Sequence, residues 1–479
     1  MDSSDTIVGG DTASSNSVTI KLLIGPLAAV LLYGILAITA PATLPSEAAI
    51  TAAITLWCIL WWVTEPVPIP VTSLLPLSLF PIFGVLDASA VAASYGSPLI
   101  ILMLGGFMLS RGMESTGTHR RLAIYMVNAC RRATGGESDR SVVIGFMLAS
   151  AILSMWISNT ATTLMLLPIA MAILEKSDNP RLPLAMMLGI AYAANVGGMG
   201  TPIGTPPNLV FMQVYAEVTD KTMSFVEWMM IGVPVVIVFM PIIAWWLTRR
   251  VNDTQGEPLV LPAAGQWQPA EKRVLTVFAC TALAWITRSE PFGGWSGLLG
   301  VQQANDAAVA LLGAIALFVV PNGKGGRLLK WEQAAQIPWG ILLLFAGGIC
   351  IAKAFASSGL SVALGDTFAA LSILPVFLMM LVLCLSVSMM TESTSNMATT
   401  ILLLPILAAA AIGVGFDPVL LMIPATLSAS CAFMLPVATA PNAIVFGSGH
   451  IRSTDMLRTG LVLNLLGAVI IAGLCYLLL

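Results

Sequence analysis

Charged side chains are scarce in this chain: Asp, Glu, Lys and Arg together make up 9% of its 479 residues. Soluble globular domains carry roughly a quarter charged residues, so the shortage excludes an ordinary soluble protein. Hydrophobic residues account for 57% of the chain, and its net charge is −3. The composition therefore predicts an integral protein of the lipid bilayer, and we expect no nucleic-acid partner.

Paired cysteines and histidine clusters are also missing. The seven cysteines fall singly, mostly inside apolar runs, as is typical of small buried residues. His119 and His450 lie far apart, and neither has a Cys or a carboxylate at metal-ligand spacing. The sequence therefore predicts no zinc or haem site and no resident cofactor.

Motifs of hydrolytic enzymes are absent from the apolar segments as well. These segments contain no HExxH helix, no GxSxG turn and no pair of aspartates. An intramembrane hydrolase needs a nucleophile with its base, or a metal cluster, inside the membrane. We therefore expect that the protein is not an enzyme.

Long apolar runs are what the chain has instead. Runs of about 20 residues, enough to cross a bilayer core of about 30 Å, recur from Ile20 to Leu479. Residues 1–18 are rich in Ser, Asp and Thr, and we expect a disordered tail there and not a cleaved signal. Ordinary spans are expected near residues 20–39, 47–64, 67–85, 91–110, 184–214, 229–248, 272–288, 305–321, 338–356, 418–447 and 457–478.

Two further apolar segments are too short for two complete crossings joined by a loop. Residues 141–174 and 374–413 are each interrupted in the middle by polar residues. Such a segment can enter and leave the membrane by the same face, as a re-entrant hairpin, when protein or water covers its turn. We therefore predict an all-α polytopic membrane protein with about 11 transmembrane helices plus two re-entrant hairpins.

Positive charges predict the orientation, because Lys and Arg near span ends collect on the cytoplasmic side. With the N-terminus inside, every Lys and Arg falls on that side except Lys221, Arg288 and Lys353. Counting either hairpin as a single crossing would reverse all later segments and remove this bias. We expect a multi-pass protein of the plasma (inner) membrane with a cytoplasmic N-terminus and an extracellular or periplasmic C-terminus.

The two halves of the chain repeat the same motifs in the same order. ISNTATTLMLLPI at 157–169 returns as TSNMATTILLLPI at 394–406, and we call Ser158-Asn159 and Ser395-Asn396 the Ser-Asn motifs. The earlier LMLGGFMLSRGMESTG (102–117) matches LLFAGGICIAKAFASSG (343–359), and the later MGTPIGTPPNLVF (199–211) matches FMLPVATAPNAIVF (433–446). Because one hairpin would enter from inside and the other from outside, the halves are inverted repeats.

Inverted repeats of secondary transporters place substrate and coupling ions at the membrane midplane, where broken helices meet. Pro206 and Pro207 in one half, and Pro436 and Pro441 in the other, predict unwound stretches opposite the Ser-Asn motifs. Helix ends at such breaks offer carbonyl oxygens to a hard cation and N–H groups to an anion, which favours alternating access over a channel. Symmetry predicts two cation sites, the first formed by Ser154, Ser158, Asn159 and Gly204 and the second by Thr391, Thr394, Asn396 and Ala438.

Three charged features have less specific interpretations. Glu392, beside the second Ser-Asn motif, is either a proton or cation site, or a cap or water-exposed group of the hairpin. Arg111 and Lys353 end matching helices and are expected to extend to opposite membrane surfaces, with contact to the substrate as the less favoured alternative. Residues 114–135, rich in arginine, are expected to form a helix lying on the cytoplasmic leaflet.

These motifs resemble the divalent anion/sodium symporter family, the INDY-like transporters of carboxylates and sulfate. ISNTATT and TESTSNMATT are similar to its paired Ser-Asn-Thr signatures, and GTPPN and LPVATAPNAIVFG to its two unwound-helix signatures. WWVTEPVPIPVTSLLPL resembles its early segment, and the resemblance runs from about residue 20 to the end of the sequence.

The resemblance implies a homodimeric elevator transporter, in which hairpins and broken helices slide with substrate and sodium along a fixed scaffold. It implies sodium-coupled import of succinate, malate, fumarate or oxoglutarate. Citrate or sulfate transport, or dicarboxylate exchange without sodium, remain alternatives. The implied domains are scaffold segments 19–113 and 272–358, an interfacial arm at 114–135, and transport-domain halves 141–248 (hairpin 141–174, unwound helix 184–214) and 374–479 (hairpin 374–413, unwound helix 418–447).

Substrate contacts are also implied by the resemblance. Met397 stands where the second signature often has threonine, so one hydroxyl donor is lost there and the preferred anion stays open. Neither motif carries an arginine, so helix dipoles and co-bound Na⁺ are expected to neutralise the anion, each ligand improving the other's binding. The expected substrate-binding residues are Ser158, Asn159, Thr160, Thr205, Ser395, Asn396, Met397 and Thr439.

Overall fold

The computed structural model describes residues 11–39, 44–133, 138–175, 177–251, 265–288, 293–301, 303–360, 363 and 375–479. Within these residues every regular element is a helix, apart from one isolated bridge between Pro321 and Arg327. The predicted all-α class is therefore confirmed. The first helix already begins at Asp11, inside the segment expected to be a tail, while residues 1–10 lie outside the described part.

The first half of the chain contains the early helices, the arm, the first hairpin and the first broken helix. The helix α7, expected as the interfacial arm, connects the early helices to the hairpin. The elements are α1 (Asp11–Thr39), α2 (Ser46–Thr64), α3 (Ile69–Thr72), α4 (Leu75–Ile82), α5 (Ala88–Tyr95), α6 (Pro98–Ser115), α7 (Thr118–Ala133), α8 (Asp139–Ser154), α9 (Asn159–Leu174), α10 (Leu182–Gly198), α11 (Pro206–Thr219) and α12 (Phe225–Thr248).

The second half begins with the helices α13 to α17. A hairpin, a broken helix and a long helix then follow, in the same order as in the first half. Each predicted hairpin is a pair of helices, α8–α9 and α19–α20, and each predicted unwound helix is split in two, α10–α11 and α21–α22. The elements are α13 (Pro269–Ile286), α14 (Gly294–Leu298), α15 (Asp306–Val319), α16 (Trp331–Ala334), α17 (Trp339–Ser357), α19 (Val376–Thr391), α20 (Asn396–Val414), α21 (Val419–Ala429), α22 (Ala440–Gly447) and α23 (Ser453–Leu478).

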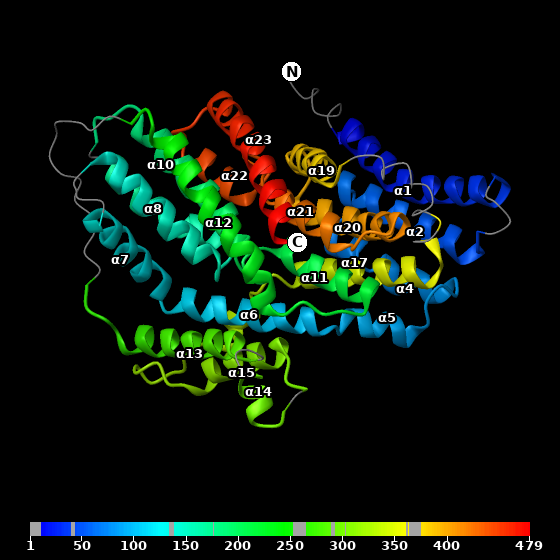
Figure 1. Cartoon of the computed structure of the whole chain (residues 1–479), viewed down its shortest axis with the longest axis horizontal. Coiled ribbons are helices and arrows are strands. Elements are labelled where there is room, and N and C mark those ends of the chain that lie inside the picture. Colours follow the sequence, from blue (N-terminus) through cyan, green and yellow to red (C-terminus); the bar gives the residue numbers. More distant parts are fainter. Residues whose placement is uncertain are drawn as a thin grey trace, which may run out of the picture.

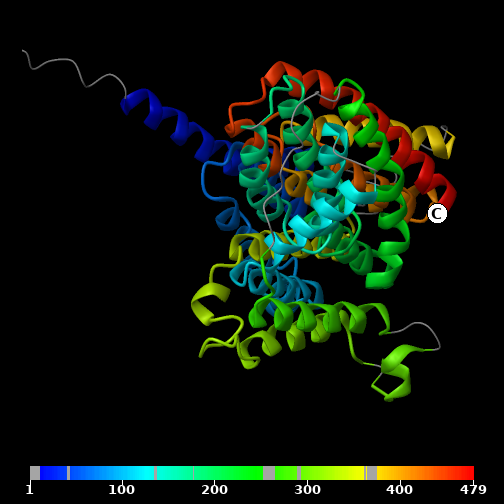
Figure 2. The ribbon, with the colours of Figure 1, turned by 90° about the vertical axis from the view of Figure 1, so that its left-hand side faces the viewer.

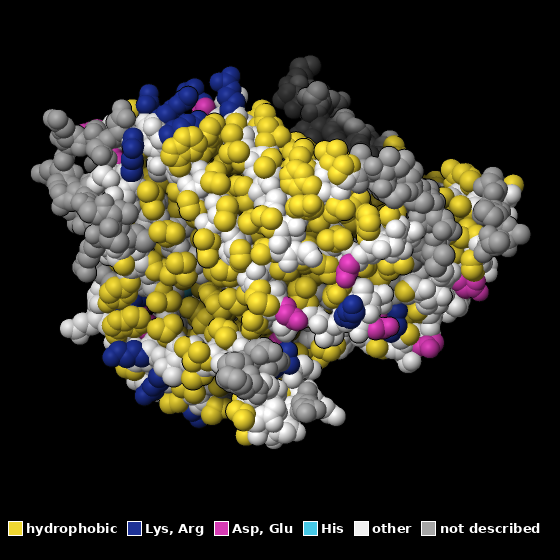
Figure 3. All heavy atoms as spheres, viewed as in Figure 1, with side chains coloured by type: hydrophobic (Ala, Val, Ile, Leu, Met, Phe, Trp, Pro, Cys, Tyr) yellow, Lys and Arg dark blue, Asp and Glu magenta, His cyan; other side chains and the backbone are white. Residues whose placement is uncertain are grey.

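Seven of the described helices are long and apolar enough to cross a membrane. Shorter apolar helices include the hairpin arms α9 and α19, the half-helices α10 and α21, and α15, whereas the hairpin arm α20 is one of the seven long helices. Large hydrophobic side chains such as Val30, Ile237 and Leu312 are more than half exposed, as expected of surfaces that face lipid. Figure 3 shows hydrophobic side chains over most of the viewed face, with Lys and Arg in small groups at its upper left and in its lower part.

The expected scaffold segments lie together although the first hairpin and broken helix separate them in sequence. Figures 1 and 2 show α13 and α15 as a layer beside α6, and α15 packs directly along α6. The approach is close at Gly105, where an added Cβ would lie 2.6 Å from the Cβ of Ala310. Small residues permit such contact between helices in a membrane, so α6 and α15 form one firmly packed unit.

The helix that follows each broken helix packs against its break through a glycine. An added Cβ on Gly232 of α12 would lie 2.4 Å from the carbonyl oxygen of Met199. An added Cβ on Gly460 of α23 would lie 2.1 Å from the carbonyl oxygen of Phe433. Met199 and Phe433 occupy matching positions of the two repeats, so both halves use the same backbone contact to support their breaks.

Gly460→Ala should destabilise the protein, because the added methyl group meets backbone atoms that have little freedom to move. Overpacking of this kind costs about 1–3 kcal/mol, so the melting temperature of the detergent-solubilised protein should fall. Gly473→Ala in the same helix is the matched control, because nothing lies within 4 Å of its added Cβ. Equal melting temperatures of the two variants would contradict the close contact.

Candidate functional site

The first hairpin turns at the first Ser-Asn motif. Ser158 caps α9, and its hydroxyl oxygen accepts a hydrogen bond from the backbone N–H of Ala161 (3.2 Å). At the end of α8, the hydroxyl of the buried Ser154 donates to Oδ1 of Asn159 (2.6 Å). The helix α8 ends at Ser154, and Ser158 caps the start of α9. A serine at this position favours the start of a new helix, which explains why the chain turns here.

The second hairpin turns in the same way. Ser395 caps α20 and accepts from the N–H of Ala398 (3.0 Å), and the buried Thr391 hydroxyl donates to Oδ1 of Asn396 (2.8 Å). Thr394, expected in the second cation site, directs its hydroxyl away from this tip, toward the carbonyl of Met390 (2.9 Å) and the hydroxyl of Thr399 (2.6 Å). Thr394 does not line the cavity described below.

The two breaks are closed by the asparagines of the Pro-Asn elements. Nδ2 of Asn208 donates to the carbonyls of Gly198 (3.0 Å) and Thr201 (2.8 Å). Nδ2 of Asn442 donates to the carbonyls of Ala432 (2.9 Å) and Leu435 (3.0 Å), which occupy the matching positions. Both asparagine side chains are buried, so they replace hydrogen bonds that water cannot supply inside a membrane.

Glu392 supports the second break. Its carboxylate accepts hydrogen bonds from the N–H groups of Phe433 (2.7 Å), Met434 (2.8 Å) and Leu435 (2.9 Å), and from Nδ2 of Asn464 (2.7 Å). Its side chain is buried, and it does not line the cavity described below. Glu392 therefore occupies the C-cap position of the hairpin helix α19, and its buried carboxylate holds the unwound stretch between α21 and α22 instead of sitting in water at the hairpin's mouth.

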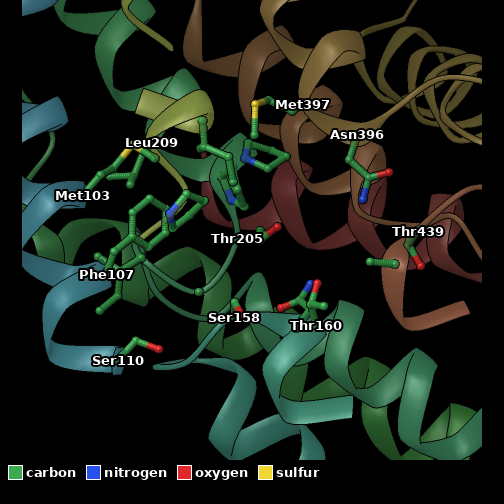
Figure 4. Close-up of a pocket in the computed structure, with 18 of the residues that line it drawn as sticks. Met103, Phe107, Ser110, Ser158, Thr160, Thr205, Leu209, Asn396, Met397 and Thr439 are labelled. Carbon is green, nitrogen blue, oxygen red and sulfur yellow. The ribbon is translucent and has the colours of Figure 1, made fainter. Parts of the chain in front are cut away.

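The hairpin tips and the breaks surround one cavity of about 700 Å³. Every residue that the sequence analysis expected at the substrate lines this cavity, and Figure 4 shows Ser158, Thr160, Thr205, Asn396, Met397 and Thr439 around it. Of the expected cation ligands, Ser158, Asn159, Gly204, Asn396 and Ala438 also line it. Ser154 and Thr391 lie behind the tips, where they orient the two asparagines.

Four helices begin at the cavity. Their N-cap residues are Ser158 for α9, Thr205 for α11, Ser395 for α20 and Thr439 for α22, and all four line it. Each helix N-terminus carries about half a positive charge and several N–H groups without intrahelical partners. The arrangement can therefore attract a doubly negative solute although neither tip contains an arginine.

The asparagine side chains of the tips can serve a cation and an anion together. Oδ1 of Asn159 accepts one hydrogen bond from Ser154, which leaves a second acceptor position for a hard cation. An added Cβ on Gly198 would lie 2.8 Å from this Oδ1 and 3.1 Å from the carbonyl oxygen of Gly204, so the two oxygens converge on one small space. Nδ2 of Asn159 is then free to donate to an anion in the cavity.

The sequence analysis missed several residues of the site. Asn195 of α10 lines the cavity, and its Nδ2 donates to the Thr439 hydroxyl (3.2 Å), while its buried Oδ1 has no hydrogen-bond partner. The one available signal was an asparagine inside an apolar helix. Met103 and Phe107 of α6 form an apolar wall in Figure 4, and no motif marked them.

One end of the cavity is formed by residues at helix ends. Arg111 and Glu114 near the end of α6 line it, together with Pro70 of α3 and with Pro338 and Gly340 at the start of α17. Arg111 is paired with Glu114 (2.6 Å) across the cavity wall, and its side chain is 32% exposed. Arg111 therefore borders the cavity, and the alternative of contact with the substrate stays open.

Comparison with known proteins supplies an independent test. The family described as "Citrate transporter" matches residues 59–420. A protein named sodium-dependent dicarboxylate transporter SdcS from Staphylococcus saprophyticus is 37% identical over 481 aligned positions, which cover 95% of this chain and 90% of the relative. SdcS from Staphylococcus aureus strain RF122 is 38% identical with the same coverage.

Two solved structures are similar in fold. The YdaH transporter of Alcanivorax borkumensis has a TM-score of 0.58 at 14% identity, over 82% of this chain and 88% of that one. MtrF of Neisseria gonorrhoeae, from a class of antimetabolite efflux pumps, has a TM-score of 0.57 at 12% identity, over 84% of each chain. At such low identity these two matches show the fold alone.

Glu392→Ala should destabilise the protein strongly, because three backbone N–H groups and the Asn464 amide would lose their acceptor in a buried place. Leaving buried donors unpaired costs about 1–3 kcal/mol each, so we expect a loss of about 3 kcal/mol or more in the free energy of unfolding. Glu392→Gln should lose less, since one oxygen remains. Thermal unfolding in detergent measures this, with the exposed neighbour Ser393→Ala as control. A melting temperature of Glu392→Ala equal to that of Ser393→Ala would show that the carboxylate does not hold the break.

Proposed function

The chain belongs to the divalent anion/sodium symporter family, and we propose that it is a sodium-coupled secondary active symporter that imports divalent carboxylates of the succinate, malate, fumarate and oxoglutarate class. It is an integral multi-pass membrane protein. The printed name of its SdcS relatives supports sodium and a dicarboxylate as the solutes. The observation that carries the proposal is the convergence of four helix N-termini on one uncharged polar site.

Sodium and the dicarboxylate are coupled through the hairpin tips. A cation at Oδ1 of Asn159 or Asn396 polarises the carboxamide and strengthens Nδ2 as a donor to the substrate. By linkage, the substrate improves sodium binding by the same factor, so neither solute binds well alone. If one net positive charge enters per cycle, a potential of 100 mV contributes about 2.3 kcal/mol, or about fifty-fold accumulation.

The division of polar and apolar lining supports an elevator mechanism. Segments 141–248 and 374–479 supply the Ser-Asn motifs, the four N-caps and Asn195, whereas α6 and α17 supply apolar residues such as Phe107 and Leu344 and, near the end of α6, Ser110, Arg111 and Glu114. A site whose polar groups belong to one unit can travel with that unit past a smooth wall. In this proposal segments 19–113 and 272–358 form the scaffold of a homodimer.

The arm α7 is fixed to the scaffold on one side. Arg121 pairs with Glu271 of α13 (2.8 Å), and both side chains are almost completely buried. The Arg121 guanidinium also stacks on Trp267 and donates to the carbonyl of Gly265 (2.9 Å). At its other end α7 packs on α8 of the first hairpin. Such an arm can hold its place while the hairpin moves.

In the proposed orientation, the end of the cavity that Arg111 and Glu114 line lies on the cytoplasmic side. Matching glycines of the two repeats are packed differently. Gly106 of α6 borders the cavity, and its added Cβ would be 3.5 Å from the nearest atom of Ile203. Gly348 of α17 is packed against the second hairpin, and its added Cβ would be 2.7 Å from the Ile401 side chain. The proposed orientation, with the N-terminus in the cytoplasm and the C-terminus outside the plasma (inner) membrane, makes this the inward-facing state.

Purified protein in liposomes tests the function. Succinate should accumulate with an inward sodium gradient and not with potassium, and coupling of this kind typically changes affinity about 5- to 150-fold. Asn159→Ala should reduce both sodium and succinate affinity, because one side chain serves both solutes. Accumulation of citrate or sulfate in place of succinate would identify another substrate of the family. Uptake that needs internal dicarboxylate but no sodium would replace symport by exchange.

Met397→Thr should change the affinity for small dicarboxylates. Met397 lines the cavity beside Asn396, and a threonine there would restore a hydroxyl donor to the second motif. One neutral hydrogen bond contributes about 0.5–1.5 kcal/mol, so the KM for succinate should fall about three- to tenfold. Thr160→Met at the matching position of the first motif is the reciprocal variant and should raise KM. Unchanged KM values for succinate and citrate in both variants would show that these side chains do not face the substrate.

A further inference from the structure

We propose that Arg111 and Lys353 guide the anion at the two mouths of the transport path, Arg111 at the cytoplasmic mouth and Lys353 at the outer mouth. The inference rests on the proposed function and orientation, and it adds two specificity-determining residues that belong to the scaffold. Neither residue lies at the Ser-Asn motifs or at the breaks. Each would act on the substrate only when the site faces its own side of the membrane.

Arg111 lies where an anion must pass to leave the site. It follows Gly106, Phe107 and Ser110 along α6, all of which line the cavity. Among the described residues that line this cavity, Arg111 is the one with a positive charge. Its guanidinium is held at the mouth by Glu114 (Nη1 to Oε2, 2.6 Å) and by Gln336, just before α17 (Nη2 to Oε1, 2.5 Å).

Glu114 sets how strongly this cation can hold an anion. A guanidinium has five N–H donors, and the contacts to Glu114 and Gln336 use two of them. The remaining donors can take a carboxylate of the departing substrate, and a charge-assisted contact of this kind is among the stronger hydrogen bonds. Because Glu114 already neutralises much of the charge, the substrate is released again instead of being retained at the mouth.

Lys353 occupies the matching position of the second repeat, near the end of α17. It also has a carboxylate nearby, Asp87 at the start of α5. The N–H of Ala90, the hydroxyl of Ser89 and, to a smaller extent, the charge of Lys353 lower the pKa of Asp87. Lys353 does not line the cavity, and Gly348, five residues before it, is packed tightly against Ile401 of the second hairpin.

Because the two halves are inverted repeats, Arg111 and Lys353 are expected to line the cavity in opposite states of the transport cycle. In the present state the wall beside Gly106 is packed less tightly and Arg111 lines the cavity, whereas the wall beside Gly348 is packed tightly against Ile401 and Lys353 does not line the cavity. When the hairpins move to the other side, the second wall opens by symmetry and Lys353 takes the place that Arg111 now has. A long basic side chain that merely extends to the membrane surface would have no such effect on substrate affinity.

The test measures the KM at each membrane face separately, in inside-out and right-side-out membrane vesicles that contain the full chain. The probe is succinate, or whichever of succinate, citrate and sulfate the wild type accumulates with sodium. Arg111→Gln should raise the KM at the cytoplasmic face about tenfold and leave the outer KM unchanged, since a lost charged hydrogen bond is worth about a factor of ten. Lys353→Gln should do the reverse.

Two further variants complete the design. Glu114→Gln should lower the KM at the cytoplasmic face, because it frees the Arg111 charge, and this opposite sign keeps the inference testable if Arg111→Gln fails to fold. Lys272→Gln removes an exposed positive charge near the start of α13, outside the cavity lining, and controls for the surface potential of that face. It should change neither KM.

The outcomes separate this inference from the proposed function. Equal KM changes at both faces in Arg111→Gln, or none at either face, would overturn the guiding role while transport itself persists. A cytoplasmic KM in Glu114→Gln that rises or stays the same would also overturn it. If the wild type accumulates none of the three anions with sodium at either face, the proposed function fails, and the inference fails with it.

Discussion

The structure depends on one constraint: a helix broken inside a membrane must find partners for the backbone groups that the break exposes. The chain meets it twice with the same device, since Asn208 and Asn442 each bridge two carbonyls across their breaks. Ser158 and Ser395 satisfy the first N–H groups of the helices that start at the tips. The N-cap residues of α9, α11, α20 and α22 line the cavity. The proposed solute site therefore lies where the helices that start at the tips and at the breaks meet.

The two halves have the same arrangement of broken helices, but different side chains form the hydrogen bonds that hold each break. The second break is held by the Glu392 carboxylate and by two side chains of α10, because Tyr192 donates to the carbonyl of Phe433 (2.6 Å) and Asn195 to Thr439 (3.2 Å). The first break relies on neutral groups, among them the Trp228 indole, which donates to the carbonyl of Met199 (2.9 Å). The first half of the chain thus helps to build the second half of the site. This cross-connection joins the two repeats into one unit around the cavity.

Two charged side chains near the cavity, Arg111 and Glu392, lie at its edge or outside it, where they do not hold a solute too tightly. The centre of the cavity is lined by hydroxyls, carboxamides and helix N-termini, which attract a dianion without a fixed cation. The full charge of Arg111 lies at the edge, already paired with Glu114. Likewise Glu392 is turned away from the cavity and bound by four donors. A transporter must release what it binds, and weak, distributed interactions at the centre suit that requirement.

The sequence by itself determined the membrane class, the two helix pairs, the two breaks and most of the polar residues that line the cavity, because Pro, the Ser-Asn motifs and the apolar runs act through local backbone physics. It also placed Thr394 in a cation site without revealing that Thr399 turns its hydroxyl away. Only the tertiary structure decided the roles of Asn195, Glu392 and Arg111. Their partners Thr439, Phe433 and Gln336 lie 244, 41 and 225 positions away, and only the packing of helices determines which distant residues meet.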